Sequence, residues 1–209
     1  GGQVGTPTTQ QPGLRQRRMR DTRRRILDAA RELFGEAGFH RASLEDVAAR
    51  ADVVRPTIYR HFGSKLGLFQ ALVSDAEQRA GIERVFAAME LPHAAEAVRA
   101  MLSELCRFWA AEEQLFRQVV GLAAVDPEAR QVIEGKDASR RRDMKRLAER
   151  LQRQGGLEPG WSPQRAGETL WFLTSFITFD HLHRRSGVSR RALERTLHEL
   201  ASAFMTEPR

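Results

Sequence analysis

Apolar residues recur every three or four positions along most of the chain, which is the period of an amphipathic α-helix. No segment alternates apolar and polar residues as a half-buried strand does. The pattern therefore predicts an all-α fold. The expected helices span about 21–37, 44–50, 54–62, 64–86, 93–110, 112–125, 126–151, 162–179 and 189–205.

The stretch 43–65 is predicted to contain two short helices joined by a three-residue turn. Ser43 is expected to cap the first helix, and Asp46, three residues later, completes a capping-box pattern. Pro56 suits the first turn of the second helix, because its missing N–H has no intrahelical partner there. Gly63 is expected to end that helix. A short, exposed and basic helix after such a turn is typical of a DNA-binding helix-turn-helix.

Three blocks of this stretch carry a resemblance to a known family. They are Ser-Leu-x-Asp-Val-Ala from residue 43, Ala-x-Val from residue 51, and Thr-Ile-Tyr-Arg-His-Phe-Gly-Ser-Lys from residue 57. Together they resemble the DNA-binding domain of TetR-family transcriptional regulators, over about residues 23–69. Asp52 and Val54 depart from the family, which commonly has Gly and Ser there. The turn and the second N-cap are therefore less ideal.

Base readout is expected from the second helix of the pair. Arg55, Thr57 and Arg60 can reach base edges in a major groove, where arginine pairs bidentately with guanine and the threonine methyl contacts thymine. Ser43, at a helix N-terminus, can offer its hydroxyl and backbone N–H to a phosphate.

Phosphate contacts are implied by the resemblance for Tyr59, His61 and Lys65. The alternative for His61 is a capping or surface histidine. Phe62 is expected in the core of the three-helix domain, together with Phe39. The full expected DNA-binding set is Arg23, Ser43, Arg55, Pro56, Thr57, Tyr59, Arg60, His61 and Lys65.

Positive charge is concentrated near the start of the chain. Residues 14–65 hold 13 Lys or Arg against 7 Asp or Glu, which is most of the net charge of +7 and suits a polyanion-binding module. Residues 1–20 are predicted to be a disordered basic arm, 21–67 the helix-turn-helix domain, and 68–209 a helical effector-binding and dimerisation domain. The seven arginines of 14–25 can contact phosphates or an adjacent groove. Alternatively, they form a frayed helix start that adds only non-specific affinity.

A small-molecule cavity in the C-terminal region is implied by the resemblance, and its apolar residues suit a hydrophobic or aromatic effector. The alternative is that these side chains are plain core. The resemblance also implies that the last two helices form a homodimer through a four-helix bundle. The candidate effector-binding residues are Met101, Leu105, Trp109, Phe116, Trp171, Phe172, Ser175 and Phe176.

Catalytic, metal and cofactor sites are not predicted. Asp180, His181 and His183 suggest a metal cluster, but histidines two positions apart on a helix point to different sides. Cys106 lies on an apolar helical face, where burial disfavours the thiolate. The single cysteine is compatible with a reducing cytosol. No apolar leader or membrane-spanning run appears, and a cytoplasmic location is expected.

The sequence thus predicts a dimeric, ligand-responsive transcriptional regulator, with repression of a palindromic operator as the expected mode. Two rivals stay open. A non-specific DNA-coating protein would bind with strong salt dependence and no sequence preference. A small helical enzyme would show turnover, although no catalytic constellation supports it.

Overall fold

The computed structural model describes residues 13–37 and 41–206. Contacts divide the chain into unit 1, Gly1–Leu68, and unit 2, Phe69–Arg209. Within the described residues the regular elements are helices, apart from an isolated bridge between Leu157 and Met205. The predicted all-α fold is confirmed.

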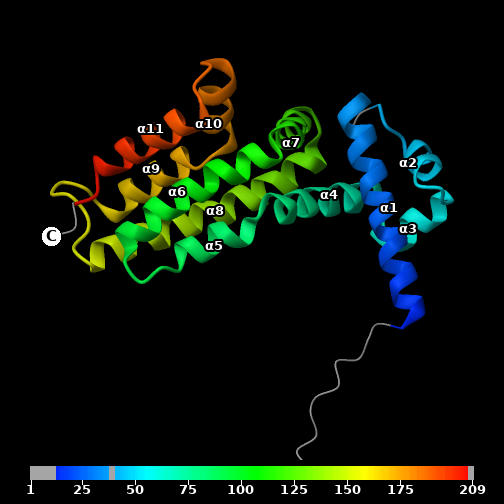
Figure 1. Ribbon diagram of the computed structural model, residues 1–209, viewed down its shortest axis with the longest axis horizontal. Coiled ribbons are helices and arrows are strands. Elements are labelled where there is room, and N and C mark those ends of the chain that lie inside the picture. Colours follow the sequence, from blue (N-terminus) through cyan, green and yellow to red (C-terminus); the bar gives the residue numbers. More distant parts are fainter. Residues whose placement is uncertain (1–12, 38–40, 207–209) are drawn as a thin grey trace, which may run out of the picture. The chain divides into compact units, whose positions relative to one another are not determined.

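Unit 1 packs three helices around a small apolar core (Figure 1). They are α1 (Leu14–Ala37), α2 (Leu44–Arg50) and α3 (Arg55–Phe62). Helix α4 (Lys65–Ala80) begins in this unit and ends in unit 2. The core side chains are buried and come from all three helices: Ile26, Phe34, Val47 and Ile58.

The start of α1 differs from the prediction. Residues 14–20, expected in a disordered arm, are helical, and α1 begins at Leu14 rather than near Asp21. The segment has no internal Gly or Pro and is rich in Arg, a good helix former. A helix already nucleated by its packed half propagates through such residues at little cost. The expected disorder of residues 1–12 and the expected core role of Phe39 lie outside the described residues.

A second difference lies in the helix after Ser64. One helix was expected to run to about Phe86, but α4 ends at Ala80 and α5 (Ile82–Met89) follows. Gly81 stands between them with φ +81°, a left-handed conformation that glycine adopts without steric penalty.

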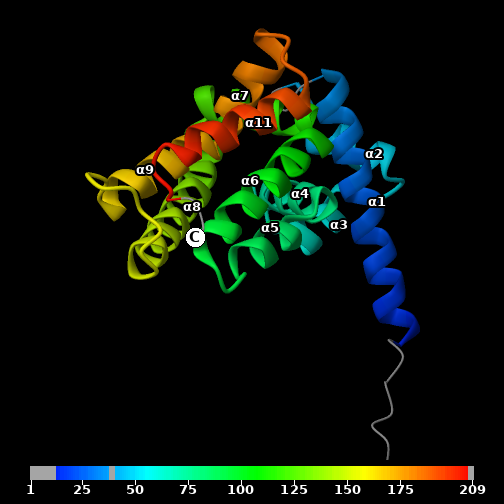
Figure 2. The same cartoon turned by 60° about the vertical axis from the view of Figure 1, so that its left-hand side comes forward.

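Unit 2 is built around α6, which packs against α5, α7, α8, α10 and α11 (Figures 1 and 2). Helices α8 and α9 lie in close contact, because Gly167 of α9 sits against the backbone of α8: a Cβ there would lie 3.0 Å from Lys145 Cα. The remaining elements of the unit are α6 (Ala94–Ala111), α7 (Glu113–Val125), α8 (Pro127–Arg153), α9 (Pro163–Leu173), α10 (Phe176–Asp180), the π-helical η1 (His181–Arg185) and α11 (Arg190–Ser202).

The expected helix from Ser162 to Phe179 is interrupted. Helix α9 ends at Leu173, and Ser175 starts α10 by accepting a hydrogen bond from the Thr178 N–H through its hydroxyl (3.1 Å). Apolar periodicity does not reveal such a break, since the same residues stay apolar on both sides of it. Ser prefers the N-cap to the helix interior, so its side chain is the local signal.

Candidate DNA-binding interface and candidate effector site

The capping box that the sequence predicts at the start of α2 is present. Ser43 Oγ accepts from the Asp46 N–H at 3.1 Å, and the Ser43 N–H donates to Asp46 Oδ2 at 2.9 Å. Hydrogen bonds from the Ser43 hydroxyl and N–H to the carboxylate lower the pKa of Asp46. Asp46 is therefore ionised at neutral pH, and the first turn of α2 is stabilised by its own residues.

The turn into α3 requires a backbone conformation and an N-cap for which its residues are poorly suited. Asp52 has φ +53° and is the only non-glycine residue in the described part of the chain with positive φ. Val54 is the N-cap of α3 and provides no side-chain hydrogen bond, as expected from a valine. Pro56 lies in the first turn, and Gly63, with φ +77°, ends the helix. The predicted helix-turn-helix is confirmed, with α3 starting at Arg55.

Helix α3 presents one exposed face and one buried face. Arg55, Pro56, Tyr59 and Arg60 are exposed, whereas Ile58 is fully buried in unit 1. Positions three and four apart share a face of an α-helix, so the four exposed residues form one surface. This surface carries two guanidinium groups and a phenol, the donors that read guanine edges and phosphates.

Arg55 is held by a partner that sequence reasoning missed. Its guanidinium forms an ion pair with Glu45 of α2, and Nη2 donates to the Tyr59 hydroxyl at 2.8 Å. The group also lies 5.3 Å from the centre of the Tyr59 ring. Arg55 and Tyr59 therefore orient each other. To contact DNA, Arg55 must either break its ion pair with Glu45 or bind the DNA while still paired with it. No local sequence signal links two residues ten positions apart across a turn.

Arg23 and His61 meet at the end of α3. Arg23 Nη1 donates to the His61 carbonyl oxygen at 3.2 Å, and the guanidinium covers the half-buried Phe62 ring at 4.5 Å from its centre. Arg23 thus ties α1 to α3. Burial, then the neighbouring charges of Arg60 and Arg23, lower the pKa of His61. His61 is therefore neutral at pH 7 in the free protein and can donate a hydrogen bond without adding charge.

The remaining predicted residues of the interface lie at the two ends of α3. Thr57 is half-buried, and its Oγ1 accepts a long 3.4 Å bond from Arg60 Nη2. Lys65 opens α4, where Ser64 Oγ accepts from the Gly67 N–H at 2.9 Å. Here α4 passes so close to α3 that only glycine fits at position 67: a Cβ there would lie 1.9 Å from the Phe62 carbonyl oxygen.

In unit 2, three of the candidate effector residues form an aromatic cluster. Trp109 lies 4.9 Å from Phe116 and 5.3 Å from Phe176, between ring centres and with tilted or edge-on geometry. Phe108, which was not predicted, joins them at 4.7 Å from Trp109. Edge-to-face contacts of this kind stabilise a core beyond their buried area. Met101 and Leu105 are buried on the same helix, α6.

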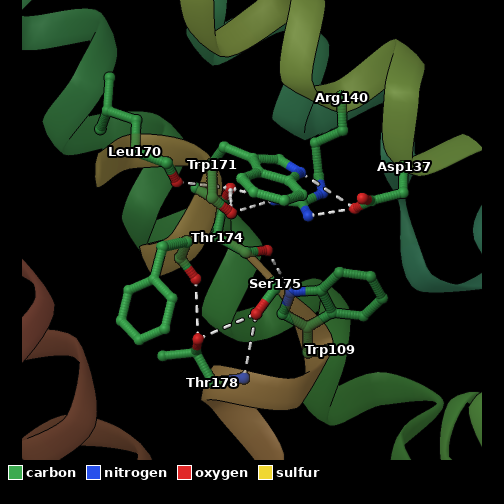
Figure 3. A network of polar contacts seen from close by, with 9 residues as sticks. Trp109, Asp137, Arg140, Leu170, Trp171, Thr174, Ser175 and Thr178 are labelled. Atoms are coloured by element: carbon green, nitrogen blue, oxygen red, sulfur yellow. Dashed lines mark hydrogen bonds and ion pairs between the residues drawn. The ribbon is translucent and has the colours of Figure 1, made fainter. Parts of the chain in front are cut away.

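Trp171 and Ser175 belong instead to a polar network at the break between α9 and α10 (Figure 3). Arg140 of α8 donates to Thr174 Oγ1 at 2.6 Å and to the Trp171 carbonyl oxygen, and it pairs with Asp137. The Trp171 indole N–H donates to Asp137 at 3.1 Å.

The network also contributes hydrogen bonds to backbone carbonyl groups on both sides of the helix break. Thr178 Oγ1 donates to the Phe172 carbonyl oxygen at 2.7 Å, and the Trp109 indole N–H donates to the Thr174 carbonyl oxygen at 3.1 Å (Figure 3). Arg140 and Thr178 were not predicted as functional. An arginine run on a charged helix reads as a solvated face, and only the packing of α8 on α9 shows that Arg140 points inward.

Phe172 is placed differently from the prediction. It is 64% exposed and does not join the aromatic cluster. Ile177, across the helix break, is 67% exposed. The prediction treated 162–179 as one continuous helix and placed Phe172 in the effector cavity, whereas both residues lie at the surface of unit 2.

Two further predictions concern reactive groups. Cys106 is buried, and burial raises the pKa of its thiol to about 12, so the thiolate is not formed at neutral pH. Asp180 is occupied by Arg117, whose Nε and Nη2 donate at 3.0 and 2.8 Å, and His183 Nδ1 lies 2.7 Å from the Val188 carbonyl oxygen. Among the described residues, no three potential ligands come together as a metal site.

These features define a class: an all-helical protein with an N-terminal helix-turn-helix and a larger helical unit. Residues 26–72 match the family described as bacterial regulatory proteins, tetR family. Over this stretch the chain is similar to the DNA-binding domain of TetR-family transcriptional regulators. In the described residues, no helix combines the length and apolar character needed to span a membrane.

Curated relatives are similar to this chain over short segments. The HTH-type transcriptional regulator UidR of Escherichia coli is 46% identical over 59 residues, which are 28% of this chain and 30% of UidR. The HTH-type transcriptional activator FasR of Mycolicibacterium smegmatis is 46% identical over 55 residues, which are 26% of this chain and 25% of FasR. The similarity therefore spans less than a third of these relatives.

Solved structures resemble nearly the whole chain. A transcriptional regulator of the TetR/AcrR family from Thermobifida fusca has a TM-score of 0.65 at 25% identity, over 87% of this chain and 96% of that one. A complex of SmeT with triclosan has a TM-score of 0.72 at 19% identity, over 89% and 92%. A putative regulator from Saccharomonospora viridis, bound to choline, has a TM-score of 0.67 at 19% identity, over 90% and 100%. The last two likenesses establish the fold of both units.

Proposed function

We propose that this protein is a sequence-specific transcriptional regulator that binds a palindromic operator as a homodimer. The observation that carries the proposal is the exposed face of α3, where Arg55, Tyr59 and Arg60 project from a helix-turn-helix whose first helix has a capping box. One such helix covers few base pairs, so two copies related by a two-fold axis are needed to specify an operator. Ser43, His61 and Lys65 are proposed to hold the phosphates beside it.

A second copy is proposed to cover the apolar surface of α9, α10 and α11. Phe172 and Ile177 are about two-thirds exposed, and Leu200 of α11 is about half exposed. Large apolar side chains at the surface favour a partner surface of the same kind. In a two-fold dimer the same patch is used on both copies. The dimer is thus proposed to form through the last helices of the chain.

A small hydrophobic or aromatic effector is proposed to bind in unit 2, near Trp109, Phe116 and Phe176. The aromatic cluster supplies an apolar surface, and Ser175 and Thr178 supply hydroxyl groups nearby. Two structural neighbours are complexes with small molecules, triclosan and choline. The effector is proposed to favour a dimer in which the spacing of the two α3 helices no longer matches the spacing of successive major grooves. The protein then releases the operator.

The proposed mode is repression, and selection from random duplex DNA at near-physiological salt is its first test. A recovered palindrome with half-sites about one helical turn apart (about 34 Å) is the expected result. No motif, together with affinity that falls steeply with salt, would instead support the non-specific DNA-coating protein. A reporter placed behind the recovered operator then gives the sign of regulation. FasR, described as an activator, shows that both signs need the test.

Two substitutions separate base readout from phosphate binding. Arg60→Ala is expected to change the preferred base at one position of each half-site, because an exposed arginine on α3 can pair with guanine. Lys65→Ala is expected to weaken all sequences alike and to lower the salt slope by about one. Affinity is measured on the selected operator and on a scrambled duplex. Equal losses on both duplexes for Arg60→Ala would remove Arg60 from the base-reading set.

A further inference from the structure

The N-terminal half of α1 is a basic helix that continues past the packed core of unit 1. Residues 14–25 contain seven arginines and one aspartate, a net charge of +6. All side chains from Leu14 to Asp21 are exposed. Figures 1 and 2 show this part of α1 running on beyond α2 and α3 as a single helix. We name residues 14–23 the basic extension.

The charges of the basic extension repel one another along the helix. Arg15 and Arg18 are three positions apart, and like charges at this spacing destabilise a helix. Farther along α1, Arg24 pairs with Asp28 at 3.3 Å and Arg25 approaches Asp52 at 4.0 Å, so these two charges are partly offset within the unit. A polyanion that runs along the extension would remove the repulsion.

The last residue of the basic extension, Arg23, lies beside the C-terminal end of α3. Arg23 donates to the His61 carbonyl oxygen and covers the Phe62 ring, so this point of α1 is fixed to the last turn of α3. From Arg23 to Arg15 the helix rises about 12 Å at 1.5 Å per residue. Phosphates on one strand of DNA advance about 3.4 Å along the axis per base pair, so this length corresponds to about three or four base pairs.

We propose that the basic extension binds the phosphate backbone of the DNA flanking each half-site, within about four base pairs of the bases that α3 reads. This inference rests on the proposed function, because it requires α3 to lie in the operator. The contact is electrostatic and independent of sequence. The contact extends the stretch of DNA that the protein covers and raises the affinity for DNA. It leaves the preferred bases unchanged.

The test compares two triple variants of the full-length protein. Arg15→Gln, Arg18→Gln and Arg20→Gln together remove three charges from the extension, and glutamine keeps a helix propensity close to that of arginine. The matched control removes three exposed charges from α8 of unit 2, by Arg142→Gln, Arg146→Gln and Arg153→Gln. Circular dichroism is used to check that helix content is unchanged in both variants.

Affinity is measured on two duplexes of the selected operator, one ending at the outer edge of each half-site and one extended by four base pairs on each side. On the extended duplex, the extension variant is expected to bind about 10 to 100 times more weakly, with a salt slope lower by about two to three per protomer. On the trimmed duplex it should match the wild type within about threefold, and the control variant should match on both.

Three results would overturn the inference. The first is equal affinity of the extension variant and the wild type on the extended duplex. The second is the same loss of affinity on both duplexes, and the third is an equal loss for the control variant. If the extension variant also releases the protein from phosphatidylserine-containing vesicles while keeping full DNA affinity, the extension binds a membrane surface instead. A wild-type protein that selects no operator would overturn the proposed function itself, which distinguishes the two failures.

Discussion

Replacing Gly67 by alanine is expected to destabilise the protein and to weaken operator binding at least tenfold. The new Cβ would lie 1.9 Å from the Phe62 carbonyl oxygen and 3.0 Å from its carbonyl carbon. Both atoms are backbone, so α3 or α4 must move. Overpacking of this kind typically costs about 1–3 kcal/mol. A shift that costs about 1.4 kcal/mol of binding free energy gives the tenfold loss. Urea denaturation and anisotropy with the operator measure the two effects.

Gly35→Ala is the matched control for this prediction. Gly35 lies in α1, and a Cβ there would have no heavy atom within 4 Å. Alanine favours a helix over glycine, so this variant should gain roughly 0.5–1 kcal/mol of stability and keep its DNA affinity. The same chemical change thus has opposite signs at the two positions. A Gly67→Ala protein that is as stable as Gly35→Ala and binds the operator normally would contradict the role assigned to the close approach.

Replacing Arg140 by alanine is expected to lower the free energy of unfolding by about 2–3 kcal/mol. Its side chain is only 19% exposed and donates to Thr174 Oγ1 and the Trp171 carbonyl oxygen while pairing with Asp137. Removing one member of a buried ion pair typically costs about 3–5 kcal/mol. Asp137 is 40% exposed, so water can replace part of the lost interaction and the smaller figure is expected here. Denaturation at one fixed protein concentration measures the change, because the proposed dimer would contribute to apparent stability.

Arg141→Ala is the control for Arg140, since it removes the same group one position along α8. Arg141 is 57% exposed and pairs with Glu168 at 3.3 Å, and exposed pairs contribute about 0–1 kcal/mol. Arg140→Lys keeps the charge but loses the planar fork that serves several acceptors at once, so an intermediate loss is expected. Equal losses for Arg140→Ala and Arg141→Ala would show that the network at the α9–α10 break does not depend on Arg140.

The helix-turn-helix was predictable because its signals are local. Ser43 and Asp46 are three residues apart and form their capping box within one turn. Pro56 and Gly63 mark the first turn and the end of α3 through their own backbone preferences. Even the poor N-cap at Val54 followed from the residue type, since valine has no side-chain acceptor. Met101, Leu105 and Phe116, which the sequence offered as apolar residues of a cavity or of plain core, are buried.

Prediction was weaker where a helix starts or breaks without a strong local signal. Residues 14–20 of α1 were expected to be disordered on composition, but they continue a helix that is nucleated by packing farther along. Phe172 was expected inside because apolar residues surround it in the sequence, and the break at Ser175 leaves it at the surface. Polar residues between two helices can stop a helix only if other groups donate hydrogen bonds to its free carbonyl oxygens, and such donors come from neighbouring segments of the fold.

By itself, the sequence determined the all-α fold, the helix-turn-helix and the basic character of the N-terminal region, since helix periodicity, caps and charge are read within a few residues. Only the tertiary structure decided that Arg55 pairs with Glu45, that Gly67 must remain glycine, and that Arg140 points into unit 2. Each of these depends on two segments meeting in space. The physical reason is the short range of hydrogen bonds and steric contacts, which act between neighbours in the fold rather than between neighbours in the chain.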